Sequence, residues 1–85
     1  MKLDGYEVAQ IQLPDPCDTD PHPRLIFQGW GIHAGEGFTA WLPEGWTRIR
    51  LEISWETTGA ASWYIAGRSE ICPVGLFCRT DEEGY

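Results

Sequence analysis

The clearest alternation of apolar and polar residues runs from Thr47 to Trp55. A period of two is typical of a β-strand with one buried face. The inward positions are Ile49, Leu51, Ile53 and Trp55, and the outward positions are Arg48, Arg50, Glu52 and Ser54. Phe38–Leu42 is a second β-forming run, and Pro43-Glu44-Gly45 supplies turn chemistry between the two. We therefore predict a β-hairpin at the centre of the fold.

Weaker patterns predict further strands on both sides of this hairpin. They lie at residues 3–13, 25–28, 62–67 and 76–79. Apolar residues do not recur at helical spacing over three turns anywhere in the chain, so a helical fold is disfavoured. The sequence predicts one all-β domain over residues 1–85, a small open barrel or a strongly curved antiparallel sheet of five or six short strands. Its expected core comprises Phe38, Ile49, Leu51, Ile53 and Trp63.

Two segments interrupt the strand pattern, and a polar segment follows the last predicted strand. Residues 14–24 contain four prolines and three aspartates, which predicts an exposed irregular loop. Residues 29–37 contain four glycines around His33 and predict a corner without helix. Residues 80–85 form an acidic tail.

The net charge is −7, and the excess of carboxylates lies at the two ends of the chain. Residues 24–79 hold five arginines and five glutamates, which cancel. An acidic chain is repelled by phosphate, so direct binding to a nucleic-acid duplex is disfavoured. A basic nucleic-acid-binding protein would be attracted instead. Charge that serves solubility alone is the competing interpretation.

Cysteine usage and hydropathy indicate where the protein resides. Three cysteines, an odd number, suit a reducing compartment better than a disulfide framework, although a Cys72–Cys78 bridge stays open as an alternative. The first residues lack a signal-like apolar region, and no apolar run is long enough to span a bilayer. We therefore predict a cytoplasmic protein without membrane association. With two histidines and no Cys-x-x-Cys pair, we expect neither a metal nor another cofactor.

Candidate catalytic residues are few. His33 and Glu36 lie among glycines and could form an acid–base pair, but no nucleophile motif accompanies them. The glycine spacing does not match the phosphate-binding pattern Gly-x-Gly-x-x-Gly. We interpret His33 as structural and predict that the protein is not an enzyme.

Candidate binding residues combine the acidic N-terminal region with the outward face of the central strand. Arginines beside tryptophans have the composition of a binding hot spot, and equally that of a solvated strand face. Five tryptophans exceed what so small a core absorbs, so at least one is expected to be exposed and to mark an interface. The predicted partner-binding residues are Glu7, Asp15, Asp18, Asp20, Arg48, Arg50 and Glu52.

Several short motifs between residues 30 and 79 carry a family resemblance. They are Gly31-Ile32-His33-Ala34-Gly35-Glu36-Gly37-Phe38, Trp46, Arg50 with Glu52, Trp63-Tyr64, Gly67, and Gly75-Leu76 with Arg79. This pattern resembles a small bacterial family of unknown function that is common on mobile genetic elements. Members carry Leu-His-Cys-Gly-Glu, then Arg-x-Glu, Trp-Tyr and Gly-Leu-x-x-Arg. Ala34 replaces the family's cysteine, so thiol chemistry at that position is absent here.

The resemblance implies a compact β fold and a mobile-element context, and it transfers no activity. Small acidic proteins in that context are often inhibitors of host nucleic-acid-targeting defences, including anti-CRISPR proteins. We therefore predict a non-enzymatic acidic inhibitor, of phage or mobile-element type, that blocks a basic nucleic-acid-binding protein. The alternative is a nucleic-acid-binding accessory domain that uses exposed tryptophans with Arg48 and Arg50. The sequence leaves the oligomeric state open.

Overall fold

The computed structural model describes residues 1–17 and 19–80, and its regular elements are almost entirely strands. These are β1 (Lys2–Leu3), β2 (Tyr6–Gln10), β3 (Ile26–Phe27), β4 (Trp30–Gly31), β5 (Gly37–Leu42), β6 (Gly45–Ile53), β7 (Trp63–Ile65) and β8 (Phe77–Arg79), with one short 3₁₀ helix, η1 (Gly59–Ser62). The all-β prediction is confirmed. No helix among the described residues has the length and apolar character needed to cross a membrane.

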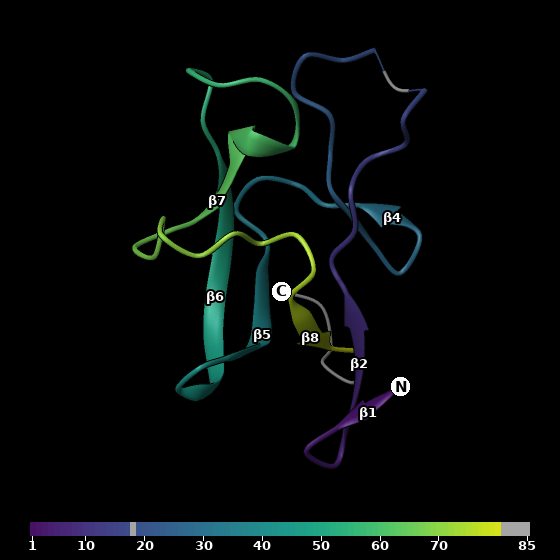
Figure 1. The fold of residues 1–85 in the computed structure, drawn as a ribbon, viewed down its shortest axis with the longest axis vertical. Coiled ribbons are helices and arrows are strands. Elements are labelled where there is room, and N and C mark those ends of the chain that lie inside the picture. Colours follow the sequence, from purple (N-terminus) through teal and green to yellow (C-terminus); the bar gives the residue numbers. More distant parts are fainter. Residues whose placement is uncertain (18, 81–85) are drawn as a thin grey trace.

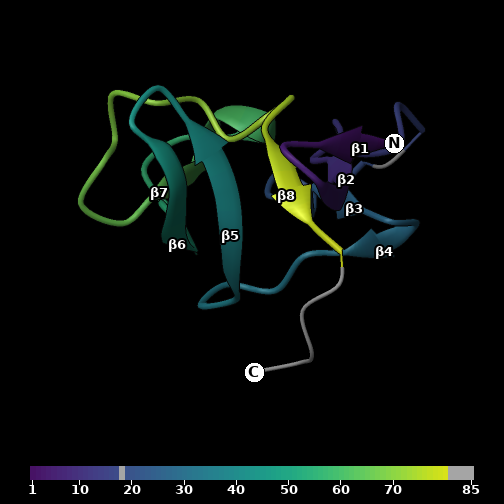
Figure 2. The ribbon, with the colours of Figure 1, turned by 90° about the horizontal axis from the view of Figure 1, so that it is seen from below.

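Six of the strands form one antiparallel sheet in the order β1-β2-β8-β5-β6-β7. β8 therefore inserts between β2 and β5, which are far apart in sequence (Figure 1). β3 and β4 form a separate two-stranded sheet, which lies beside β2 and away from β6 and β7 (Figure 2). Within the described residues β1 and β7 are the two ends of the large sheet, so it is an open curved sheet and not a closed barrel.

The central hairpin is confirmed as β5 and β6. Phe38 lies opposite Ile49, and both are buried, whereas Arg48 and Arg50 are exposed, as the alternation predicts. The prediction is wrong at Trp55, which is 72% exposed. The reason is that β6 ends at Ile53, so the alternation no longer fixes the direction of Trp55. Its ring instead meets that of His22 edge to face at 4.6 Å.

The predicted strand at residues 3–13 is two strands joined by a tight turn. Asp4 and Gly5 both have positive φ, 52° and 85°, which is the geometry of a two-residue type I′ hairpin. Gln28 and Gly29 join β3 to β4 in the same way, with φ of 53° and 81°. The first of these turns carries the Asp-Gly pair that favours such hairpins.

The core lies between the inner face of the large sheet and the β3–β4 hairpin. Phe27 contacts Phe38 edge to face, with ring centroids 5.1 Å apart. The buried core cluster comprises Ile11, Leu25, Ile32, Phe38, Ala40, Leu42, Ile49, Leu51, Trp63, Ile65 and Cys78. Four of the five predicted core residues belong to it, and Ile53 packs against its edge, half-buried.

The proline-rich loop between β2 and β3 is tied to the rest of the fold by hydrogen bonds at Pro21, His22 and Pro23. The buried Nε1 of Trp63 donates a hydrogen bond to the carbonyl of Pro23 at 2.8 Å. Pro23 is buried, whereas Asp15–Cys17 and Thr19–Pro21 are exposed. The three cysteines are free thiols, with Cys78 buried and both Cys17 and Cys72 exposed.

Candidate functional site

The face of the large sheet that points away from the core, here called the outer face, carries an unusual set of side chains. Opposite residues of neighbouring strands share a face. The pairs Trp41–Trp46, Thr39–Arg48 and Gly37–Arg50 between β5 and β6 alternate with the buried pair Phe38–Ile49, so they point outward. The pair Val8–Arg79 between β2 and β8 points outward by the same reasoning, because the intervening Cys78 is buried.

Tyr6 lies two residues before Val8 on β2 and therefore also points outward. It forms an aromatic–arginine cluster with Trp41, Trp46 and Arg79. The ring of Trp46 meets Trp41 at 5.0 Å and Tyr6 at 5.6 Å, both edge to face. The guanidinium carbon of Arg79 lies 3.8 Å from the centre of the Tyr6 ring and 5.9 Å from that of Trp46. This is cation–π geometry.

The cluster joins strands that are not neighbours. Tyr6 belongs to β2 and Trp46 to β6, and β8 and β5 lie between them. At about 4.8 Å per strand, the two backbones would stand about 14 Å apart on a flat sheet. The side chains lean across the middle strands, and Asp4 Oδ2 accepts a hydrogen bond from Trp46 Nε1 at 3.1 Å. Val8, also outward, is only 4% exposed.

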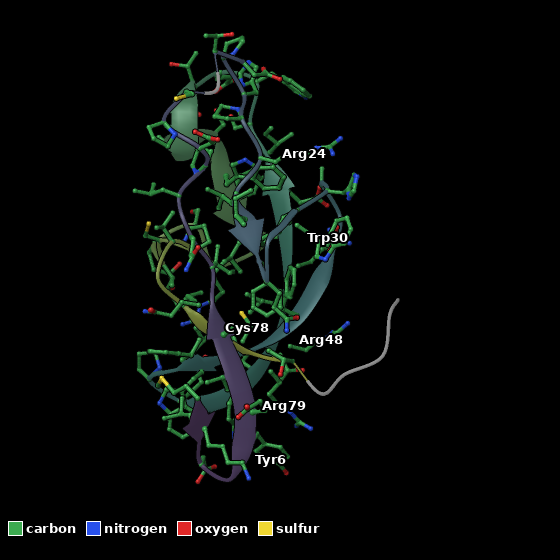
Figure 3. All side chains as sticks on the ribbon, turned by 90° about the vertical axis from the view of Figure 1, so that its right-hand side faces the viewer. Tyr6, Arg24, Trp30, Arg48, Cys78 and Arg79 are labelled. Carbon is green, nitrogen blue, oxygen red and sulfur yellow. The ribbon has the colours of Figure 1, made fainter. Side chains whose placement is uncertain are left out.

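The cluster is nevertheless accessible. Tyr6 and Trp41 are 37% and 38% exposed. Figure 3 shows Tyr6 and Arg79 together toward one end of the molecule, with Arg48 farther along. Rings that are held in place by their neighbours lose little conformational entropy on binding, so this is a preorganised contact surface.

The predicted site residues fall into separate groups. Arg48, Arg50 and Glu52 share the outer face of β6, and Arg50 Nε pairs with Glu52 at 2.9 Å. Glu7 follows Tyr6 on β2 and points to the other face, where its carboxylate lies 3.6 Å from the amino terminus.

The acidic loop lies between β2 and β3, at the end of the molecule opposite the β1–β2 turn (Figure 1). Its described carboxylates make local contacts, because Asp15 accepts from the amide of Cys17 and Asp20 from that of His22. Asp18 lies outside the described residues.

Tyr6 and Arg79 were not among the predicted site residues. A usable signal was present for both. The Asp4-Gly5 turn fixes the register of β2 and so the direction of Tyr6, whereas Arg79 follows an apolar residue by one position on β8. The cation–π contact itself depends on β8 lying next to β2, and residues 70 positions apart reveal no such pairing in one sequence.

Each of the two histidines lies within hydrogen-bond distance of a polar side chain. His33 Nδ1 lies 3.0 Å from Glu36 Oε1, which also accepts from the His33 amide, so the pair closes the glycine corner. His22 Nδ1 lies 3.1 Å from the hydroxyl of Ser62. That hydroxyl is buried and donates to the carbonyl of Thr57, so its proton is already used. Among residues 1–17 and 19–80 no three potential metal-ligating side chains gather.

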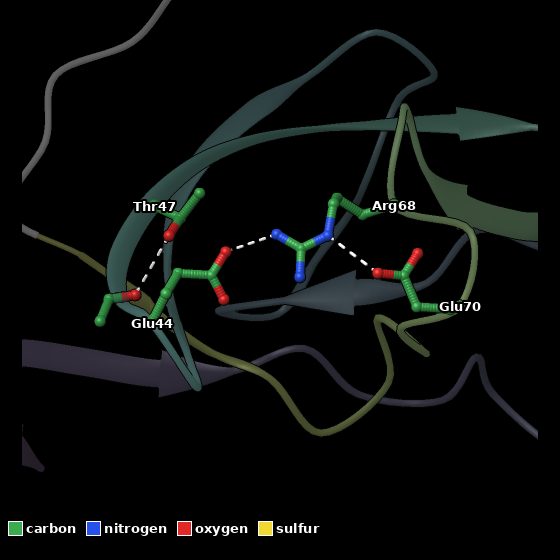
Figure 4. Close-up of polar contacts among 5 residues, drawn as sticks. Glu44, Thr47, Arg68 and Glu70 are labelled. Carbon is green, nitrogen blue, oxygen red and sulfur yellow. Dashed lines mark hydrogen bonds and ion pairs between the residues drawn. The ribbon is translucent and has the colours of Figure 1, made fainter.

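An ion-pair bridge borders the outer face where β7 ends. Arg68 contacts Glu44, in the β5–β6 turn, through Nη1 and Glu70 through Nε (Figure 4). The hydrogen bonds from Arg68 lower the pKa of both carboxyl groups and raise the pKa of the guanidinium. The bridge ties the 66–72 segment to the hairpin turn beside the edge of β6, and charged groups at a sheet edge discourage pairing with other chains.

The Arg68 bridge predicts a pH dependence of stability. Because the pKa values of Glu44 and Glu70 are lowered in the folded chain, their contribution is present above about pH 4.5 and is lost as the pH falls through the folded values. Arg68→Gln should therefore lower the melting temperature at pH 7 by a few degrees at most, with the difference disappearing near pH 3. Thermal unfolding followed by circular dichroism at pH 3, 5 and 7 measures this.

Lys2→Gln removes the same charge from a lysine that makes no ion pair within residues 1–17 and 19–80. Lys2→Gln should leave the difference in melting temperature between pH 7 and pH 3 close to that of the wild type. If Arg68→Gln lowers the melting temperature as much at pH 3 as at pH 7, the Arg68 side chain stabilises the fold through packing and not through its ion pairs.

No protein-family model, curated protein or solved structure matches this chain. The resemblance to a mobile-element family therefore stays a prediction.

Proposed function

We propose that this chain is a non-enzymatic binding protein that docks a partner protein on its outer face, with the aromatic–arginine cluster as the anchor. The observation that carries the proposal is the contact of Tyr6, Trp46 and Arg79 across four strands, with rings that remain accessible. Tyrosine, tryptophan and arginine are the residues that dominate binding energy at protein interfaces. Their mutual contacts hold them in place before the partner arrives.

Charge favours a basic partner. The chain carries a net charge of −7, and the described acids Asp15 and Asp20 are exposed on the loop between β2 and β3. Carboxylates on an exposed loop speed the encounter with a basic surface and add less to final affinity. A basic nucleic-acid-binding protein fits this pattern, so we propose that binding inhibits such a protein, as anti-CRISPR proteins of phages and mobile elements do.

One observation supports a second candidate, binding of single-stranded nucleic acid on the same face. Arg48, Arg50 and Arg79 share that face with Trp41 and Trp46, and aromatic rings beside arginines can stack bases and hold phosphates. The net negative charge opposes this candidate, because it repels phosphate at a distance.

Trp41→Ala tests the anchor. The indole of Trp41 makes no hydrogen bond to the described residues and lies at the accessible end of the cluster, so its removal should leave the fold intact. Loss of a hot-spot side chain costs about 2 kcal/mol of binding free energy, or about 30-fold in affinity. Proteins retained from a host lysate by the immobilised wild type are identified by mass spectrometry, and affinity for the purified candidate is then measured by calorimetry.

Trp30→Ala is the matched control, since Trp30 is 79% exposed on β4, outside the large sheet. The proposal requires a partner that binds the wild type and Trp30→Ala equally and Trp41→Ala much more weakly. Equal binding by all three chains would contradict it. A gel shift of single-stranded DNA or RNA that is lost in Trp41→Ala would favour the second candidate.

A further inference from the structure

A hollow lies beside the middle of β6, C-terminal to Trp46 of the aromatic–arginine cluster. Its volume is about 490 Å³, and Arg48, Arg50 and Arg68 line it together with Gly35, Gly37 and Ala66. Gly37 lies opposite Arg50 on the outer face of β5. Gly35 and Gly37 have no side chains that could fill the hollow, and Ile49 and Ile65 complete its lining beside the arginines.

Gly37 also sets the position of Arg48. A Cβ atom at residue 37 would stand 2.8 Å from Arg48 Nη2, closer than real Cβ contacts come. The Arg48 guanidinium therefore lies over the bare backbone of Gly37, and its Nη1 reaches Thr39 Oγ1 at 3.5 Å. This places the guanidinium of the exposed Arg48 beside the hollow.

Carboxylates compensate the charges of Arg68 and Arg50 to different extents. Arg68 contacts two carboxylates, those of Glu44 and Glu70, so it supplies a wall without net positive charge. Arg50 forms an ion pair with the carboxylate of Glu52 through Nε. Arg48 and Arg50 stand two residues apart on one strand, about 7 Å, which lets two guanidinium groups converge on one small anion.

We infer that the hollow over Gly35 and Gly37 binds an oxyanion, a carboxylate or a phosphoryl group, between Arg48 and Arg50. The inference rests on the proposed function in naming the origin of the anion, an acidic or phosphorylated side chain of the protein partner. Arginine suits this role because its planar guanidinium donates two parallel hydrogen bonds to a carboxylate or phosphate. The arrangement would fix the register of a partner anchored at the aromatic–arginine cluster.

The test uses the full chain without any partner, so that its outcome is separate from that of the proposed function. Inorganic phosphate or sodium acetate is titrated at constant ionic strength, with chloride as the reference salt, and amide and guanidinium shifts are followed by NMR. Saturable shifts at Gly35, Gly37, Arg48 and Arg50 are expected. Saturation by phosphate alone points to a phosphoryl source, and saturation by both points to a carboxylate as well.

Two variants locate the site. Arg48→Ala should weaken the apparent affinity about threefold to tenfold, the range for one exposed charge-assisted contact. Gly37→Ala keeps every charge but pushes the flexible end of Arg48 aside, so it should weaken binding similarly and leave the melting temperature unchanged or higher. Arg24→Ala is the control, because Arg24 does not line this hollow.

Shifts that follow phosphate and chloride alike, or that are equal in the wild type, Arg48→Ala and Gly37→Ala, would overturn the inference. If the anion binds as expected and the Trp41→Ala experiment fails, the hollow stands without the proposed anchor. If the anion does not bind and Trp41→Ala weakens partner binding, the anchor stands without an anion site in the hollow.

Discussion

Trp63→Ala is expected to lower the free energy of unfolding by about 3–5 kcal/mol. Trp63 is buried in the core cluster, and its indole nitrogen holds the loop between β2 and β3 through the carbonyl of Pro23. The substitution therefore opens a cavity and leaves a buried carbonyl without its donor. A domain of this size has a total stability of about 5–10 kcal/mol, so the variant should be close to unfolding at 37 °C. Urea denaturation followed by tryptophan fluorescence and circular dichroism measures the change.

Two further variants separate the contributions at this position. Trp63→Phe keeps most of the ring but not the N–H, and it should cost about 1–3 kcal/mol for the unsatisfied carbonyl of Pro23. Trp30→Ala removes an equal side chain from an exposed position and should change stability by less than about 0.5 kcal/mol. Similar losses in Trp63→Ala and Trp30→Ala would mean that the core is not where the structure places it.

Leu51→Ala is expected to cost about 3–5 kcal/mol, because Leu51 is fully buried at the centre of β6. Its backbone pairs with Ile65 of β7 on one side and bonds Gly35 and Glu36 on the other, so the surrounding chain cannot collapse readily into the cavity. Equilibrium denaturation again measures the loss, and the slope of the transition should stay constant if two-state unfolding is kept.

Leu13→Ala is the matched control for this experiment. The same atoms are removed at a position that is 61% exposed, so a loss below about 0.5 kcal/mol is expected. A loss at Leu51 no larger than that at Leu13 would refute the inward direction of Leu51 and with it the register of β6.

The strands that were predicted best are those whose partner lies next to them in the sequence. β5 and β6 pair through a two-residue turn, so local alternation and turn chemistry determine their register. The error at Trp55 arose because alternation does not say where a strand ends. Residues 3–13 have no clearly apolar face, and the turn at Asp4-Gly5 within them was missed. That dipeptide is itself a strong hairpin signal.

The candidate site was less accessible to prediction from the sequence. Arg48, Arg50 and Glu52 share a face because they alternate on one strand, which any reader of the sequence can count. Tyr6, Trp46 and Arg79 meet only because β8 inserts between β2 and β5, and the hollow exists only because Gly37 lies opposite Arg50. The first depends on pairings between distant segments, which one sequence does not reveal, whereas the Gly37–Arg50 pair follows from the register of the local β5–β6 hairpin.

The insertion of β8 between β2 and β5 also constrains the order in which the chain can fold. Ala9 pairs with Cys78, so a large loop must close before β2 acquires its neighbour in the large sheet, and such distant contacts slow folding. The β5–β6 hairpin, which closes locally, is the natural nucleus. On the ribosome, the nascent chain would keep the facing edges of β2 and β5 open until Phe77–Arg79 had left the exit tunnel. We therefore expect a released chain that is truncated before Phe77 to be aggregation-prone, whereas a released chain that ends after Thr80 keeps β8 and can complete the sheet.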